Sequence, residues 1–112
     1  MRWPYVACLV ALLPLLVGCG ETRNQPPQIL SFSCQPTTVP VGRPIRCVVQ
    51  AEDPEGQPLT YSWFASSACA IEAVRDGRAV VTCAVAGDVI VGVIVRDPFG
   101  AEAQADTFIT VQ

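Results

Sequence analysis

From Gln28 to the C-terminus, apolar residues recur at every second position in short runs, and turn-forming residues separate the runs. A β-strand points successive side chains to opposite faces, so this alternation predicts strands with one buried face. The apolar positions, run by run, are Leu30, Phe32 and Cys34; Ile45, Cys47, Val49 and Ala51; Leu59, Tyr61, Trp63 and Ala65; Ile71 and Ala73; Val81, Cys83 and Val85; Val89, Val91, Val93 and Val95; and Ala105, Thr107, Ile109 and Val111. About seven short strands without any helical repeat predict an all-β, antiparallel β-sandwich.

Glycine and proline mark the turns between these runs. Arg75-Asp76-Gly77 fits a three-residue hairpin loop with its glycine in the left-handed conformation. Pro98-Phe99-Gly100 and Pro54-Glu55-Gly56 fit the same template. The preceding Asp97 and Asp53 can accept hydrogen bonds from the turn backbone, so we expect hairpins at all three places.

Two segments of this region resemble a family of bacterial surface domains. AEDPEGQPLTYSW (51–63) and AGDVIVGVIVRDPFGAEAQADTFITV (86–111) are similar to the PKD-type, immunoglobulin-like domain. Leu59, Tyr61 and Trp63 match the Leu-x-Tyr-x-Trp strand of that family, and the alternating run from Gly87 to Asp97 matches a later strand. The chain departs from the family after Trp63, where many members continue with Asp-Phe-Gly-Asp-Gly.

The resemblance covers residues 28–112. It implies an immunoglobulin-like (PKD- or cadherin-like) sandwich without catalytic activity, used for adhesion, spacing or carbohydrate contact.

The first eighteen residues have the pattern of an export signal. Arg2 supplies a positive charge, and the apolar stretch 6–17 is roughly half as long as a membrane-spanning helix. It ends in Leu16-Val17-Gly18-Cys19, which resembles the lipobox of bacterial lipoproteins. An ordinary secretory signal with an incidental cysteine is the alternative interpretation.

The lipobox resemblance implies that signal peptide 1–18 is removed and that Cys19 carries a lipid anchor. Residues 19–27 would then be the lipidated cysteine and a polar tether, and residues 28–112 the folded domain. We therefore expect a protein held on the bacterial envelope by lipid. Gly20 stands where enteric bacteria place an inner-membrane retention aspartate, which favours the outer membrane where one exists, and otherwise the outer face of the plasma membrane.

Of the six cysteines, Cys8 lies in the predicted signal peptide and Cys19 would carry the lipid. The four that remain in residues 28–112 predict two disulfides, because exported proteins meet an oxidising compartment. With a loop at 75–77, Cys69 falls opposite Cys83, and a tight turn near 39–42 sets Cys34 opposite Cys47. The alternative pairing, Cys47–Cys83, would join strands expected to be neighbours. A four-cysteine zinc site is disfavoured, because the chain has no Cys-x-x-Cys knuckle.

Two groups of side chains are candidates for binding. The first gathers at one end of the predicted sandwich and could offer oxygen ligands to calcium, or its aspartates could simply cap their turns: Glu52, Asp53, Glu55 and Asp97. The second faces outward by strand parity and would form an apolar patch for a partner, or merely reflect strand propensity: Phe64, Ile90, Ile94 and Phe108. We expect no other cofactor.

The amino-acid composition disfavours two classes of function, enzymes and nucleic-acid-binding proteins. The chain has no histidine, the usual general base, and no nucleophile motif, so we expect no enzyme. Its net charge of −3 and lack of a basic stretch disfavour nucleic acid. The leading hypothesis is a lipid-anchored module that binds an envelope protein or glycan. The alternatives are a small inhibitor of an envelope hydrolase and a structural subunit of an envelope assembly.

Overall fold

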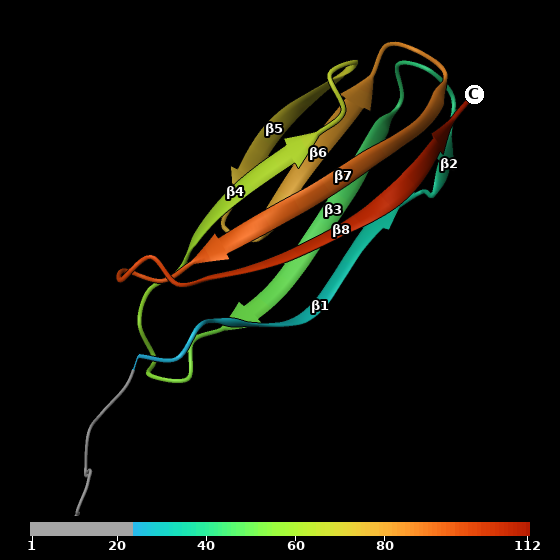
Figure 1. Ribbon diagram of the computed structural model, residues 1–112. Coiled ribbons are helices and arrows are strands. Elements are labelled where there is room, and N and C mark those ends of the chain that lie inside the picture. The colour runs from blue at the N-terminus through green and yellow to red at the C-terminus, as the bar shows by residue number, and fades with distance from the viewer. Residues whose placement is uncertain (1–23) are drawn as a thin grey trace, which may run out of the picture.

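The computed structural model describes residues 24–112, which form an immunoglobulin-like sandwich of two four-stranded sheets (Figure 1). The first sheet has the strand order β1-β3-β6-β5, and the second has the order β2-β8-β7-β4. The strands are β1 (Gln28–Gln35), β2 (Thr38–Val39), β3 (Pro44–Glu52), β4 (Thr60–Ala65), β5 (Cys69–Arg75), β6 (Arg78–Cys83), β7 (Gly87–Arg96) and β8 (Glu102–Val111). The all-β sandwich predicted from the alternation is therefore confirmed.

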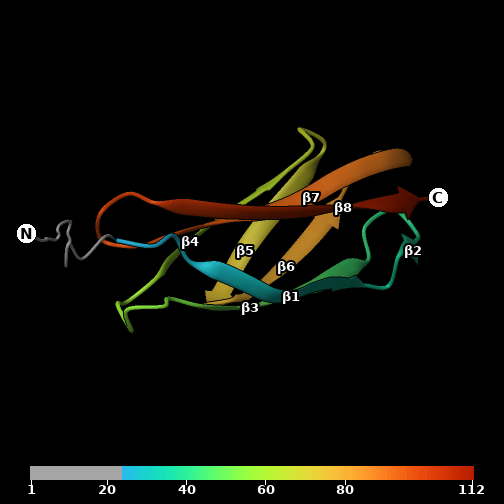
Figure 2. The same ribbon diagram turned by 60° about the horizontal axis from the view of Figure 1, so that its bottom comes forward.

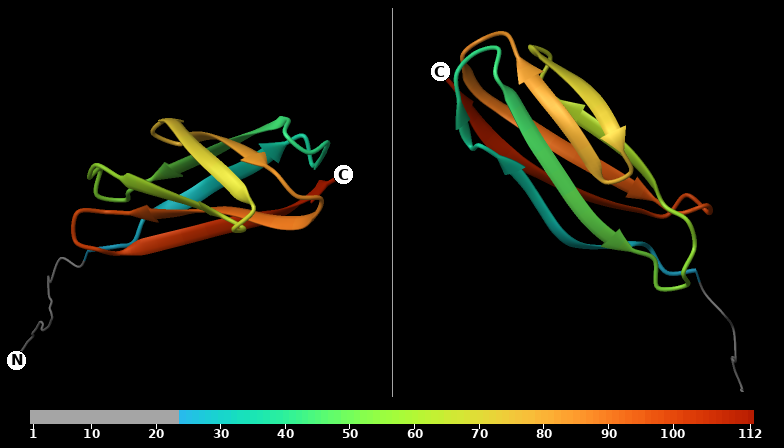
Figure 3. Two further views of the ribbon diagram at one scale, coloured as in Figure 1. Left: turned by 90° about the horizontal axis from the view of Figure 1, so that it is seen from above. Right: turned by 180° about the vertical axis from the view of Figure 1, so that it is seen from behind.

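The core lies between the two layers, which Figure 2 and Figure 3 show from further directions. Ile45 and Val81 enter it from the first sheet, and Val91, Val93 and Ile109 enter it from the second, all with 0% exposure. Burial of one such side chain contributes about 1.5–3 kcal/mol, which explains why the alternation determines the fold. The predicted inward faces of β3 and β7 are confirmed.

In strand β1, the side chains do not all point to the predicted side of the sheet. Its pairing with β3 is irregular between Ile29 and Ser31. An extra residue in a strand reverses the side-chain alternation beyond it. Leu30 is consequently 59% exposed, whereas Ile29 is half-buried. The inward prediction was wrong for Leu30 and holds for Phe32 and Cys34, which pack in the core cluster.

The segment between β1 and β3 is not the tight turn that the sequence predicts. The chain crosses to the second sheet, where Thr38 and Val39 of β2 pair in parallel with the end of β8. It returns through a turn in which the Arg43 amide donates to the Pro40 carbonyl (3.2 Å) and Gly42 has a φ of 82°. The sandwich therefore has eight strands instead of about seven, and one pair is parallel.

The predicted hairpins form at two of the three turn motifs. β7 and β8 pair through the turn at Pro98-Phe99-Gly100, and β5 and β6 pair through the turn at Asp76-Gly77. The turn at Pro54-Glu55-Gly56 instead connects β3 of one sheet with β4 of the other, so it is no hairpin. Val85 lies beyond the end of β6 and is 59% exposed, contrary to the inward prediction.

The two ends of the sandwich differ in what they present. The first described residues, drawn in blue, lie with the β3–β4 and β7–β8 turns at one end, and the C-terminus lies at the other (Figure 1). The signal segment and Cys19 lie outside the described residues. Within residues 24–112, no helix is long and apolar enough to cross a membrane.

Candidate functional site

The four residues of the predicted apolar patch lie on the outer side of the second sheet. Ile90 pairs directly with Phe108 of β8, and Phe64 of β4 pairs with Gly92 of β7. Ile94 follows on the same face, because Val91 and Val93 point into the core and the alternate positions 90, 92 and 94 face outward. We call Phe64, Ile90, Ile94 and Phe108 the apolar face.

Exposure within the apolar face is uneven. Phe108 is 68% exposed and Ile90 is 39% exposed, whereas Phe64 and Ile94 are half-buried. Phe108 is therefore the most prominent apolar group of this surface, and Phe64 belongs to its floor.

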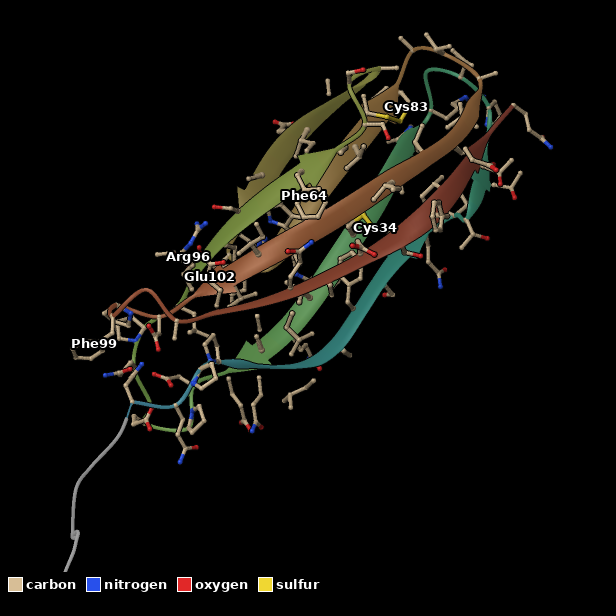
Figure 4. All side chains as sticks on the ribbon, in the orientation of Figure 1. Cys34, Phe64, Cys83, Arg96, Phe99 and Glu102 are labelled. Atoms are coloured by element: carbon tan, nitrogen blue, oxygen red, sulfur yellow. A yellow bond between two sulfur atoms is a disulfide. The ribbon has the colours of Figure 1, made fainter. Side chains whose placement is uncertain are left out.

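Gly92 of β7 explains why the side chain of Phe64 is half-buried against the sheet. A Cβ atom added to Gly92 would overlap Cζ of Phe64 and would also stand 2.8 Å from the carbonyl oxygen of Ala105. The Phe64 ring thus covers the backbone of β7 at a position without a side chain, beside Ile90 and Ile94 on the same face. Figure 4 shows the ring against β7. A glycine inside a strand often marks such a close approach, and this signal was available in the sequence.

Polar groups surround the apolar face. Thr110 Oγ1 donates to Asp88 Oδ1 (3.1 Å), and Arg96 forms an ion pair with Glu102. Ser66 extends the pairing of β4 with β7, because its Oγ accepts from the Ile90 amide (3.0 Å) and its amide donates to the Ile90 carbonyl (3.0 Å). An apolar centre with a polar rim is the usual anatomy of a protein interface.

The acidic end of the sandwich is organised by turns. Asp53 Oδ2 accepts from the Gln57 amide (2.9 Å), and Asp97 Oδ1 accepts from the amides of Phe99 and Ala101 (both 2.9 Å). Asn24 Nδ2 donates to Asp97 Oδ2 (2.7 Å). This hydrogen bond lowers the pKa of Asp97 below its usual value; desolvation opposes the shift, and the turn amides add to it.

The other two predicted calcium ligands lie on the surface of the same end. Glu55 accepts from the Gln25 amide (3.1 Å), and Glu52 is the exposed last residue of β3. Among residues 24–112, no three Asp, Glu or Cys side chains are grouped closely enough to hold a metal ion. The hydrogen bonds give Asp53 and Asp97 the turn-capping role that is the alternative to calcium binding, and calcium binding itself stays an untested hypothesis.

Both predicted disulfides are present, and the alternative pairing is wrong. Cys34–Cys47 joins β1 to β3, and Cys69–Cys83 joins β5 to β6, with Cα–Cα distances of 4.0 and 3.9 Å. Each bridge links residues that pair directly in the sheet. Figure 4 labels Cys34 and Cys83. Two disulfides indicate a compartment outside the cytosol.

Comparisons with solved structures find the same architecture in other proteins. A nucleoside hydrolase-related hypothetical protein from Saccharophagus degradans, associated with carbohydrate metabolism, matches 80% of this chain with a TM-score of 0.65 and 21% identity. The first two extracellular domains of human protocadherin-24 (EC1-2) match 80% of it with a TM-score of 0.51 and 24% identity. The chain spans 26% and 44% of these two proteins, so the likeness concerns one domain.

These similarities show the fold alone. No protein-family model and no curated protein sequence matches the chain.

Proposed function

We propose that this protein is a lipid-anchored, non-enzymatic module of the bacterial envelope that binds a partner through its apolar face. The lipid anchor rests on the lipobox resemblance of Leu16-Val17-Gly18-Cys19. The absence of histidine from the whole sequence supports a role without general acid–base chemistry. The two disulfides support an oxidising location.

The apolar face carries the binding proposal. Two phenylalanines and two isoleucines from three neighbouring strands share one outer surface, whereas monomeric proteins rarely leave such clusters uncovered. Phe108 and Ile90 pair directly at its exposed part. We favour a protein over a glycan as the partner, because the apolar face offers no hydrogen-bonding side chain to sugar hydroxyl groups and only one well-exposed planar ring, that of Phe108.

Photo-crosslinking in the native envelope tests this function. A benzophenone amino acid at position 108 should form adducts with a protein, which mass spectrometry identifies. The same amino acid at Val85, an exposed apolar site outside the face, is the matched control and should form no such adduct. Equal adducts at both positions, or none at position 108, would contradict the proposal, and adducts with envelope polysaccharide would reassign the partner to a glycan.

A surface variant complements the crosslinking. Ile90→Ser should weaken the adduct at position 108, because a central apolar contact often dominates an interface. It should leave the free energy of unfolding nearly unchanged, because Ile90 lies outside the core. A large loss of stability would show instead that Ile90 serves the fold.

A structural subunit of an envelope assembly is a second candidate, because a subunit would dock through the same apolar face. Such a subunit should remain in a stoichiometric complex after the envelope is solubilised with mild detergent. A regulated binding module should instead be recovered largely as free protein.

A further inference from the structure

The outer side of the first sheet carries a second candidate site, a pocket with a volume of about 320 Å³. Three arginines line it: Arg46 of β3, Arg75 of β5 and Arg78 of β6. Val48, Val74 and Val80 are among its apolar lining residues. The sheet that carries this arginine pocket faces the viewer in the right panel of Figure 3. It lies on the opposite side of the sandwich from the apolar face.

The strand register brings the three arginines together. Arg75 pairs directly with Arg78 across the β5–β6 hairpin. Arg78 also pairs with Val48, two residues along β3 from Arg46, so Arg46 is its diagonal neighbour. The irregularity of β5 between Ala73 and Arg75 creates the direct Arg75–Arg78 pair. Sequence spacing alone does not reveal this cluster.

The arginine pocket gathers three positive charges that no ion pair among the described residues neutralises. Like charges directly opposite each other destabilise a sheet. Within residues 24–112, Arg46, Arg75 and Arg78 form no ion pair or side-chain hydrogen bond with another residue, and Arg96 forms the ion pair with Glu102. Glu72 lies on the same side of the sheet, opposite Val80, but does not line the pocket. Three of seven cations thus meet in one place in a chain with a net charge of −3.

We propose that the arginine pocket binds an acidic peptide segment of a partner protein. Guanidinium groups bind carboxylates through paired, charge-assisted hydrogen bonds, and they stay charged at every physiological pH. The valines would pack against the methylene groups of the acidic side chains, which an extended peptide presents on one face from every second residue. No aromatic side chain lines the pocket, so it lacks the stacking platform that a sugar ring would use.

Fluorescence anisotropy with the purified full chain in mild detergent tests the proposal. A labelled peptide of alternating glutamate and valine should bind at low ionic strength and dissociate as salt is added. A peptide of alternating glutamine and valine should not bind. No binding of the glutamate peptide would overturn the proposal.

Matched arginine variants locate the site. Arg46→Gln and Arg78→Gln should each weaken peptide binding by about tenfold or more, because each removes a charged hydrogen-bond partner. Arg96→Gln makes the same charge change on the opposite sheet and should leave binding unchanged. Equal weakening by Arg96→Gln would show unspecific attraction and overturn the proposal.

A stability measurement separates binding from folding. Arg78→Gln relieves the Arg75–Arg78 repulsion, so its thermal midpoint should equal or exceed that of the unchanged chain while binding is lost. A lowered midpoint with unchanged binding would make Arg78 a structural residue and overturn the proposal.

Two competitors test the ligand class. Polygalacturonate or vesicles of an anionic phospholipid should displace the peptide poorly. Displacement by either at lower concentrations than the unlabelled peptide requires would overturn the assignment to a peptide. None of these outcomes affects the crosslinking at position 108, because that site lies on the other sheet.

Discussion

At the scale of single residues, Gly92 shapes the apolar face more than any of its large side chains. The missing side chain lets Phe64 lie against β7, so the ring of Phe64 becomes part of the floor between Ile90 and Ile94. Phe108 and Ile90 then remain as the raised, exposed part of the surface. A residue without a side chain thus determines which large apolar side chains of this surface are exposed.

Gly92→Ala should therefore destabilise the protein by about 1–3 kcal/mol, the usual cost of overpacking, as measured by chemical denaturation. Phe64→Ala in the same chain should recover part of this loss, because it removes one of the overlapping groups. The backbone oxygen of Ala105 would still oppose the new methyl group. Strictly additive effects of the two substitutions would contradict the predicted contact.

Ionisation of Asp97 makes the stability of the folded protein depend on pH. Its pKa is lowered in the folded protein, chiefly by the hydrogen bond from Asn24. A carboxylate with a depressed pKa stabilises the fold above its unfolded pKa, and this contribution is lost as the pH falls through the folded pKa. The thermal midpoint should therefore fall more steeply between about pH 5 and pH 2 in the unchanged chain than in Asp97→Asn.

Asp106→Asn removes an exposed carboxylate from the second sheet and controls for the loss of one charge. Identical pH profiles of Asp97→Asn and the unchanged chain would contradict the role of Asp97.

At the scale of elements, each disulfide pins two neighbouring strands of the first sheet. The bridges close loops with sequence separations of 13 and 14 residues. Both loops are alike in length, so we expect similar contributions from restricting the unfolded chain. The second sheet contains no bridge among the described residues and depends on the pairing of β4, β7 and β8.

Replacing Cys69 and Cys83 together with serine should lower the free energy of unfolding by about 3 kcal/mol, as estimated from the lost loop constraint. The same change at Cys34 and Cys47 should have a comparable effect, and denaturant titrations of both double variants measure it. A negligible effect in either variant would show that its bridge adds nothing to the stability of the protein.

Calcium binding at the β3–β4 and β7–β8 turns can be tested by thermal unfolding. Their aspartates already accept backbone hydrogen bonds, so millimolar calcium should leave the thermal midpoint unchanged. A ligand that binds only the folded state would raise it. A midpoint that rises with calcium but not with magnesium would instead restore the calcium site, and Asp53→Asn should then abolish the rise.

At the scale of the whole molecule, the first described residues fix the end at which the chain enters the sandwich. Asn24 and Gln25 hydrogen-bond to Asp97 and Glu55, so the chain enters the domain beside the β7–β8 and β3–β4 turns. Phe99 is 72% exposed at this end (Figure 4). Asn24 is five positions along the chain from Cys19, a stretch that can span at most about 18 Å, so a lipid on Cys19 would hold this end towards the membrane.

Cys19→Ser should release the protein from the membrane fraction without changing its thermal midpoint, because the anchor lies outside the folded domain. Fractionation and mass spectrometry of the N-terminus measure the outcome. A variant that stays in the membrane fraction with its first residues uncleaved would refute the lipid anchor.

The alternation of apolar residues was sufficient to predict the sandwich. The two disulfides also required assumed turns, and the pair Cys34–Cys47 was predicted correctly from a tight turn that the structure does not have. Side-chain direction in a strand depends only on position, so the inward faces of β3 and β7 could be read from the sequence. The same parity, with a three-residue loop at 75–77, predicts Cys69 opposite Cys83. The structure has this pair, although Arg75 itself pairs with Arg78 and the irregularity between Ala73 and Arg75 restores the register. It also places Ile90 and Phe108 on an outer face.

Only the tertiary structure decided where the alternation is interrupted and which strands become neighbours. The bulge in β1 turns Leu30 outward, and the crossing of Thr38–Val39 to β8 depends on contacts distant in sequence. The arginine pocket likewise needs the lateral order β3-β6-β5 to assemble three strands. The physical reason is that parity is a local property of the backbone, whereas bulges and strand order follow from packing between sheets.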